Sequence, residues 1–265
     1  MRQPMMIANW KMNKSLLEAK KFVEQLSAML EEKLPGRIDS DLVICAPFTA
    51  LSALSKMMAG TPLSLGAQNM HWEKEGAFTG EISPLMLKEL GVRYVIIGHS
   101  ERRTLFNENN QVVCKKIASA FAHGLLPILC IGENLEQRRA EKTEALLKEQ
   151  LYGALEGLKL EGNIMQKLVI AYEPVWAIGT GTPAEAEDAR SAATYIRAVL
   201  NALWGEPSQK IRILYGGSVN PENITSFIKL QEIDGALVGG SSLKVTDFFA
   251  LVNAVIFERG SEGVL

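Results

Sequence analysis

Residues 168–181 read LVIAYEPVWAIGTG, and this stretch places a carboxylate directly after a buried strand. The apolar run that ends at Tyr172 is nearly continuous, as expected for a strand covered on both faces, and Glu173 follows it. A Pro-Val-Trp step and a small-residue loop bounded by glycines come next. A carboxylate at a strand tip can accept a proton, and such a loop can close over it. The stretch therefore predicts proton abstraction in a site kept free of water.

Runs of the same apolar kind recur along the whole chain. The predicted strands are Met5–Trp10, Asp41–Ala46, Leu63–Ala67, Arg93–Gly98, Pro127–Gly132, Lys167–Tyr172, Lys210–Tyr215 and Ala236–Gly239. Amphipathic stretches between them predict helices at Ser15–Lys33, Thr104–His123, Gln137–Leu158 and Ala184–Leu203. Two further helix starts are expected at Ser83-Pro84 and Asn220-Pro221, where a capping side chain precedes a proline. Eight alternating strand–helix units in about 250 residues predict a closed parallel (β/α)8 barrel. No linker divides the chain, so we expect one domain over residues 1–265.

Composition limits the possible partners and compartment. The 265 residues are 47% hydrophobic and 22% charged with a formal net charge of -2, so neither nucleic acid nor an anionic membrane surface is an expected partner. Three cysteines without a CxxC motif indicate a reducing compartment. The apolar runs are too short to span a bilayer, and polar residues begin at Asn9, too early for a signal peptide. A cytoplasmic protein is expected.

Unusual polar residues gather at one end of the predicted barrel. In such barrels the chemistry lies at the C-terminal ends of the strands. There the sequence has Asn9 and Lys11 after the first strand, His99, Ser100 and Glu101 after the fourth, Glu173 after the sixth, Gly217-Ser218 after the seventh, and Gly239-Gly240 after the eighth. This convergence predicts an active site at that rim.

Four motifs resemble the signatures of the triosephosphate isomerase family. They are NWKMN at 9–13, GHSERR at 98–103, AYEPVWAIGTG at 171–181 and YGGSVN at 215–220, and the similarity extends from Met6 to about Val255. The resemblance implies an aldose–ketose isomerase that interconverts dihydroxyacetone phosphate and D-glyceraldehyde 3-phosphate through an enediolate. It implies a small phosphorylated triose as substrate and no cofactor. No group of histidines, cysteines and carboxylates has the spacing of a metal site.

The resemblance also assigns roles to individual residues. Glu173 is the expected base, and partial desolvation would make it a better one. His99 precedes a predicted helix, whose partial positive charge disfavours imidazolium, so a neutral ring would polarise the carbonyl. Lys11 would attract the phosphate and stabilise negative charge, with Asn9 as a further substrate contact. Supporting roles are expected for Glu101, which accepts a hydrogen bond from Lys11 or its network, and for Ser100, Cys130, Trp176 and Tyr215. Cys130 is interpreted as a packing residue.

Phosphate and dimer contacts complete the resemblance. Backbone N–H groups at Ser218, Gly239 and Gly240 would hold the phosphate, joined by Gly179 when the loop closes. The segment Gln68–Glu81 is long for a connection of this kind. It is similar to the family's dimer loop, so a homodimer is expected. In that dimer Phe78 and Thr79 would form the tip, with Thr79 packing against Asn9 and Glu101 of the partner subunit.

Three other interpretations compete with this one. Residues 179–184 fit G-x-G-x-x-A, but a dinucleotide site needs that motif directly after a strand. A Schiff-base aldolase would place a lysine where Glu173 stands. A non-catalytic barrel would have lost one of Lys11, His99 and Glu173. Two departures from the family pattern remain: the loop ends in Thr182-Pro183-Ala184 instead of Lys-Thr-Ala, and Ser241 stands where alanine is frequent.

Overall fold

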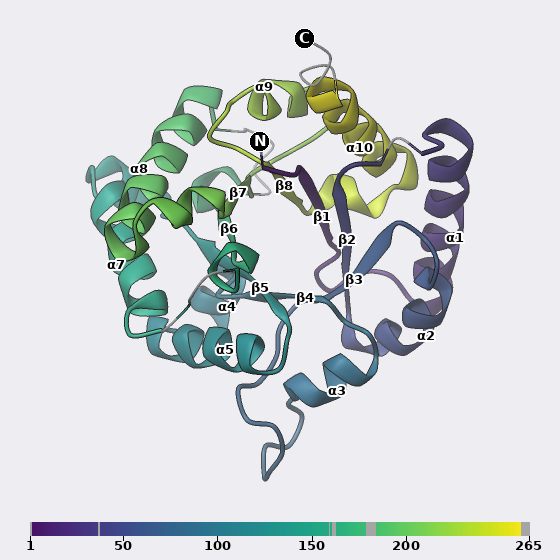
Figure 1. Ribbon diagram of the computed structural model, residues 1–265, viewed down its shortest axis with the longest axis horizontal. Helices are drawn as coiled ribbons and strands as arrows, with labels where there is room; N and C mark the ends of the chain where they lie inside the picture. The colour runs from purple at the N-terminus through teal and green to yellow at the C-terminus, as the bar shows by residue number, and fades with distance from the viewer. Residues whose placement is uncertain (1, 37, 159, 161–162, 179–183, 261–265) are drawn as a thin grey trace.

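The chain forms a closed barrel of eight parallel strands surrounded by helices (Figure 1). The computed structural model describes residues 2–36, 38–158, 160, 163–178 and 184–260. The strands are β1 (Met5–Asn9), β2 (Asp41–Ala46), β3 (Leu63–Ala67), β4 (Tyr94–Ile97), β5 (Leu126–Ile131), β6 (Val169–Tyr172), β7 (Arg212–Tyr215) and β8 (Gly235–Val238). Pairing of Met5 with Gly235 joins β1 to β8 and closes the sheet. The predicted (β/α)8 barrel is confirmed.

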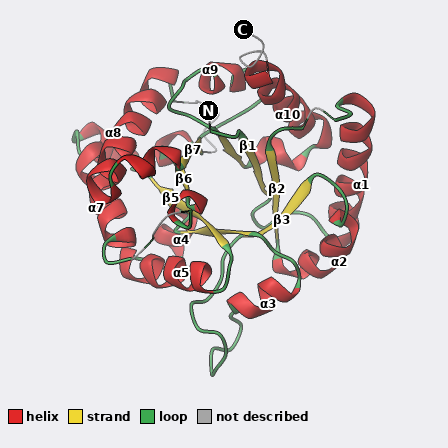
Figure 2. Cartoon of the chain, viewed as in Figure 1, coloured by secondary structure: helices red, strands yellow, loops and turns green. Residues whose placement is uncertain are grey.

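Helices cover the outside of the barrel (Figure 2). They are α1 (Leu16–Lys33), α2 (Phe48–Met58), α3 (Pro84–Glu89), α4 (Ser100–Leu105), α5 (Asn110–Ala122), α6 (Leu135–Arg139), α7 (Thr143–Leu155), α8 (Ala186–Trp204), α9 (Ile224–Ile228) and α10 (Val245–Gly260). Short 3-10 turns occur at η1 (Met165–Lys167), η2 (Val175–Ala177), η3 (Glu206–Lys210) and η4 (Gly240–Leu243). Among the residues described, no helix is both long and apolar enough to cross a membrane.

Each strand is buried on both faces because two hydrophobic clusters meet at the sheet. One fills the space between the strands and the helices, where α1 contributes Phe22, Leu26 and Leu30. The other fills the barrel interior and includes Ile7, Ile96 and Cys130. This double burial explains why the strands have continuous apolar runs instead of alternating ones.

Two predicted helices are in fact interrupted, so those predictions were wrong. The stretch Thr104–His123 is divided between α4 and α5, because Asn107 has φ +53 and the side chain of Asn109 starts a new helix by accepting from the Val112 N–H. The stretch Gln137–Leu158 is divided between α6 and α7, with Glu141 at φ +56 in the break. A left-handed residue cannot continue a right-handed helix, and neither position carries the glycine that usually marks one.

One of the two helix starts at a proline is confirmed. The Ser83 hydroxyl accepts from the Met86 N–H, and Pro84 occupies the first turn of α3. The start at Asn220-Pro221 was wrong. The Asn220 side chain instead accepts from the N–H groups of Glu222 and Asn223, which closes a turn, and α9 begins only at Ile224.

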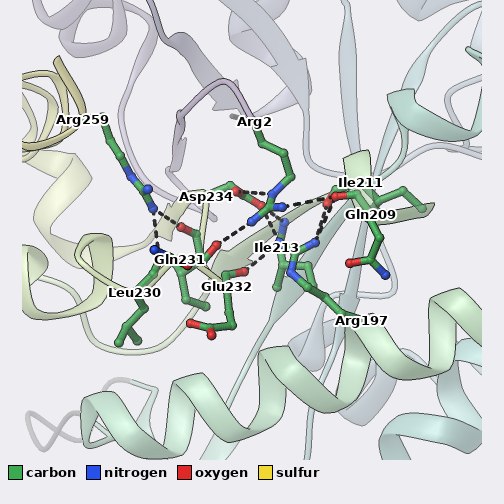
Figure 3. A network of polar contacts seen from close by, with 11 residues as sticks. Arg2, Arg197, Gln209, Ile211, Ile213, Leu230, Gln231, Glu232, Asp234 and Arg259 are labelled. Carbon is green, nitrogen blue, oxygen red and sulfur yellow. Dashed lines mark hydrogen bonds and ion pairs between the residues drawn. The ribbon is translucent and has the colours of Figure 1, made fainter. Parts of the chain in front are cut away.

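A network of polar contacts ties together the N-terminal ends of β1, β7 and β8 (Figure 3). At its centre Asp234, immediately before β8, is buried. Its carboxylate accepts from Arg2 Nε at 2.6 Å, from Arg197 Nη2 at 2.9 Å and from the Ile213 N–H at 2.8 Å. Two guanidinium groups thus hold one carboxylate between strands that are far apart in the sequence.

Candidate active site

Glu173 and His99 form a buried pair at the C-terminal end of the barrel. Glu173 follows β6 and His99 lies between β4 and α4, and both are at most 5% exposed. Glu173 Oε1 lies 3.0 Å from His99 Nε2, and Glu173 Oε2 accepts from the Ser100 N–H at 2.9 Å. Both carboxylate oxygens are therefore engaged by the segment that follows β4.

Two glycines allow the backbone to come this close to Glu173. A Cβ at Gly132 would lie 1.7 Å from the Glu173 carbonyl oxygen, because the Glu173 N–H is bonded to the Ile131 carbonyl across the β5–β6 junction. A Cβ at Gly216 would lie 3.0 Å from Cγ of Glu173. The tip of β6 is thus packed between the loops that follow β5 and β7, and a side chain at Gly132 would displace it.

The hydrogen bonds of His99 define its tautomer. Nδ1 accepts from the Glu101 N–H at 3.2 Å, so the ring proton is on Nε2, which faces Glu173. Burial lowers the pKa of His99, but the adjacent Glu173 carboxylate outweighs burial, and the pKa is raised. That increase depends on the contact with Glu173. When the carboxylate moves away, burial and the backbone N–H at Nδ1 both favour the neutral ring.

The surroundings of Glu173 keep it ionised. Burial raises its pKa, but the contacts with His99, the Ser100 N–H and nearby Lys11 outweigh burial, and the pKa lies below its usual value. A buried carboxylate that remains charged is able to accept a proton.

Lys11 is held in a strained position beside this pair. Its backbone has φ +51, the left-handed region that few non-glycine residues adopt. Asn9 Oδ1 accepts from the Lys11 N–H at 3.1 Å, and Gln68 Nε2 donates to the Lys11 carbonyl at 2.9 Å. Lys11 Nζ meets Glu101 Oε1 at 2.5 Å. Contacts from three strand-end segments therefore fix one ammonium group at the rim.

These residues line a cavity of about 230 Å³. Its lining includes Asn9, Lys11, His99, Glu173, Ile178, Ser218, Gly239 and Gly240, together with residues from the loops after β7 and β8. After β8, a Cβ at Gly240 would meet nothing within 4 Å, whereas a Cβ at Gly239 would lie 3.5 Å from Cε of Lys11. Gly179, predicted to contact phosphate, lies outside the described residues, as do Thr182 and Pro183. One end of the barrel thus combines a base, a hydrogen-bond donor, a cation and a loop rim suited to an anion.

Described residues on both sides of positions 179–183 contact β7 or the loop that follows it. On one side Ser218 Oγ donates to the Ala177 carbonyl at 2.6 Å. On the other the Ala184 N–H donates to the Tyr215 hydroxyl at 3.2 Å, and burial raises the pKa of Tyr215 to about 12. The hydroxyl therefore stays protonated at neutral pH.

The start of the same loop rests on a buried carboxylate. Glu133 Oε1 accepts from Trp176 Nε1 at 2.9 Å and from the Tyr172 hydroxyl at 3.0 Å. The Arg138 guanidinium lies over the Trp176 ring, 4.3 Å from its centre, and pairs with Asp188 at 2.7 Å. Trp176 is thus anchored by its indole N–H and by its ring face.

Cys130 lies inside the barrel and not on the cavity. It is fully buried in the interior cluster, and burial raises the pKa of its thiol well above the usual value. Phe78 and Thr79 lie on the exposed segment between β3 and α3, which projects from the barrel at the bottom of Figure 1. Phe78 packs on the His71 ring at 4.4 Å. Within the described residues, no group of three or more His, Cys, Asp and Glu could hold a metal ion.

Sequence reasoning missed two residues that shape the site. The sequence marks Gln68 only as the start of a long loop, although its place after β3 puts it at the same rim as the other polar tips. Arg103 Nε donates to the Gly98 carbonyl at 2.7 Å and Nη1 donates to Asn110 Oδ1 at 2.8 Å, which braces the His99 segment from behind. Within its motif nothing distinguishes Arg103 from a solvent-exposed helix residue.

The barrel and its rim define an enzyme that moves protons on a small anionic substrate. The model of the triosephosphate isomerase family matches residues 4–255. The chain therefore belongs to the triosephosphate isomerase family, whose members interconvert dihydroxyacetone phosphate and D-glyceraldehyde 3-phosphate, and it is an isomerase.

Similar proteins agree with this assignment over nearly the whole chain. A triosephosphate isomerase from Dictyoglomus thermophilum is 53% identical over 96% of this chain and all of its own length. One from Alkaliphilus oremlandii is 48% identical with the same coverage. The crystal structure of triosephosphate isomerase from Bartonella henselae has a TM-score of 0.84 at 35% identity, covering 95% of this chain and 98% of its own.

Proposed function

We propose that Glu173, His99 and Lys11 carry out the isomerisation. The observation that supports this is the contact of Glu173 with His99 at 3.0 Å on the wall of a cavity that also holds Lys11. Glu173 takes a proton from the carbon beside the carbonyl, and the electron pair moves to the carbonyl oxygen to give an enediolate. The same carboxyl group then returns the proton to the former carbonyl carbon. Meanwhile the hydroxyl proton moves from one enediolate oxygen to the other, a transfer that the His99 Nε2–H can mediate, so the enzyme ends with the protons it began with.

His99 stabilises the oxygen on which charge develops. Its Nε2–H, now directed at Glu173, is the donor for that oxygen once the substrate separates the two side chains. Because Nδ1 accepts from the Glu101 N–H, the ring acts in its neutral form. Glu173 must therefore leave both His99 and the Ser100 N–H to reach the substrate carbon, so the structure corresponds to a resting arrangement.

Lys11, Asn9 and the loops after β7 and β8 bind the substrate. Lys11 supplies a local positive charge for the anionic substrate, because the chain as a whole has a net charge of -2. The backbone around Ser218, Gly239 and Gly240 receives the phosphate, with Gly179 as a further donor. The whole chain then acts as a single catalytic domain in glycolysis and gluconeogenesis. The three free cysteines suit a reducing cytoplasm.

The functional unit in this proposal is a homodimer. Large apolar side chains are exposed on the projecting segment and the adjoining helix, with Phe78 42%, Leu85 45% and Met86 52% exposed. Exposed apolar groups gathered in one region mark an interaction surface. Association of two copies would cover them and would place Thr79 at the rim of the partner's site.

The catalytic assignment is tested with Glu173→Gln, which keeps the shape of the side chain and removes the base. Turnover should fall by about 10²–10⁴-fold or more. Binding of inorganic phosphate should stay close to that of the wild type. A variant that keeps more than about a tenth of wild-type turnover would contradict the role of Glu173.

The dimer is tested by sedimentation. Deleting residues 72–78 should give monomers of low activity. Phe78→Asp should weaken association, whereas Phe257→Asp, which changes a phenylalanine that is 75% exposed on α10, should not. A wild-type chain that sediments as a fully active monomer would refute the dimer.

A further inference from the structure

A second cavity opens at the opposite end of the barrel from Glu173. Its volume is about 690 Å³, and its lining includes Asp41, Tyr94, Leu126 and Arg212. These are the first residues of β2, β4, β5 and β7, so the cavity is at the N-terminal mouth of the barrel. The volume falls in the range of about 300–1,000 Å³ that is usual for small-molecule sites.

The lining of this mouth is strongly cationic. It includes the side chains of Arg2, Arg93, Lys167, Lys210 and Arg212, and Asp41 is the single acid among its described residues. The chain as a whole has a net charge of -2, so this positive charge is a local concentration. Charges of one sign gathered in a concave site focus the field on a ligand of the opposite sign.

The one acid found among the described lining residues is already engaged. Asp41 Oδ2 accepts from Arg212 Nη1 at 2.6 Å and from the Tyr94 hydroxyl at 2.8 Å. Burial raises the pKa of Asp41, but these two donors and the neighbouring guanidinium groups outweigh burial, and the pKa is lowered. Asp41 therefore offsets Arg212 and Asp234 pairs with Arg2, which leaves Arg93, Lys167 and Lys210 without an ion-pair partner among the described residues.

Three of those cations are available for a ligand. Arg2 is used by Asp234 and by the carbonyls of Gln209 and Gln231. The side chains of Arg93, Lys167 and Lys210 make no hydrogen bond or ion pair to the described part of the chain, and Arg93 rests over the Tyr94 ring at 5.5 Å. The three come from the segment before β4, from η1 and from η3. The segments η1 and η3 are in contact with each other, whereas Arg93 comes from a third segment, before β4.

We propose that this mouth binds a compact anion that carries two or more phosphate or carboxylate groups. Cations from three separate segments suit a ligand with several charged groups better than one with a single group. The amide side chains of Gln166 and Gln209 also line the mouth and add hydrogen-bonding groups. The active-site residues follow the opposite ends of the strands, so the two ligands occupy separate sites.

Isothermal titration at low ionic strength tests the proposal, with tripolyphosphate and citrate as probes and inorganic phosphate for comparison. At least one multivalent probe should bind the wild-type chain more tightly than phosphate does. The double variant Lys167→Gln/Lys210→Gln should weaken that binding by about tenfold or more. The matched control Lys20→Gln/Lys56→Gln removes two lysines on α1 and α2, away from the mouth, and should leave it unchanged.

The variant Lys11→Met separates the two anion sites. Binding at the mouth survives this change, whereas binding at the active site does not. The proposal is overturned if neither probe binds more tightly than about 1 mM, or if Lys167→Gln/Lys210→Gln binds as the wild type does. It is also overturned if the affinity is lost in Lys11→Met alone, or if the control pair loses as much as the mouth pair.

Discussion

The two ends of the barrel each bury a carboxylate, but they surround it differently. Asp234 at the N-terminal end is held by two guanidinium groups and a backbone N–H. Glu173 at the C-terminal end is held by an imidazole ring and a backbone N–H. Both are nearly inaccessible, with exposures of 5% and 2%. Burial alone therefore does not distinguish a structural acid from a catalytic one.

Asp234 and Glu173 differ in the groups that contact their carboxylates. Guanidinium groups remain charged at every accessible pH and bind carboxylates with several donors, so Asp234 has no better arrangement to move to. The imidazole beside Glu173 faces it through one nitrogen, Nε2, and one backbone N–H completes the contact. Glu173 can exchange these two contacts for a substrate.

After loss of the base itself, the largest effect is expected from removing the imidazole. His99→Gln should lower turnover by about 10²–10³-fold, the usual cost of losing one donor to a developing oxyanion. It should also move the acid limb of kcat/KM to higher pH. The contact with His99 lowers the pKa of Glu173 while burial raises it, so without the ring the pKa rises and the base is lost at a higher pH.

The control is His123→Gln, at the end of α5, which should keep both turnover and the pH profile. An acid limb that stays in place or moves to lower pH in His99→Gln would show that the ring does not hold the pKa of Glu173 down.

A substitution at the N-terminal end of the barrel should lower the stability of the protein and leave its activity unchanged. Asp234→Asn leaves Arg2 and Arg197 without their charged partner, and a broken buried pair of this kind costs about 3 kcal/mol. Turnover per folded molecule should remain close to that of the wild type. Chemical denaturation read beside activity measures both quantities. A loss of turnover without a loss of stability would reverse the distinction between the two ends.

The sequence alone could predict which residues meet at only one of the two ends of the barrel. The tips that follow the strands gather at one rim in any (β/α)8 barrel, so the sequence alone places Lys11, His99 and Glu173 together. Arg2, Arg197 and Asp234 meet across as many as 232 positions, and no motif links them. Their contact depends on closure of the sheet between β8 and β1.

Local conformation limited the prediction elsewhere. The helix breaks at Asn107 and Glu141 require a positive φ at residues that are not glycine, and an apolar period cannot show this. The role of Gln68 depends on how close its amide comes to the Lys11 and Cys45 carbonyls. Such contacts are set by packing between elements, so the residue type alone does not reveal them.

Substitutions in the barrel interior, between the two ends, should change stability and turnover less than substitutions at either end. Cys130 is buried in the interior cluster, and its raised pKa keeps it a thiol. Cys130→Ala should reduce the free energy of unfolding by about 1–2 kcal/mol through the cavity it leaves. Turnover should stay within about tenfold of the wild type, since general acid–base roles are worth about 10²–10⁴-fold. A larger loss of turnover, with the fold intact, would assign Cys130 a chemical role.

The smallest effect concerns Glu133, a third buried carboxylate, which has neutral donors and a guanidinium 3.9 Å away. Its Oε2 has no hydrogen-bond partner within the described part of the chain, and burial raises its pKa. The folded state then binds more protons than the unfolded state as pH rises above the ordinary value of 4.5. Stability therefore falls with rising pH across that window.

Glu133→Gln removes the titrating group but keeps an oxygen for Tyr172 and Trp176, so the decline of stability with pH should become shallower. Denaturation at several pH values measures the slope, with exposed Glu136→Gln as the control. A decline that is equally steep in Glu133→Gln and the wild type would mean that burial of Glu133 is offset by its donors.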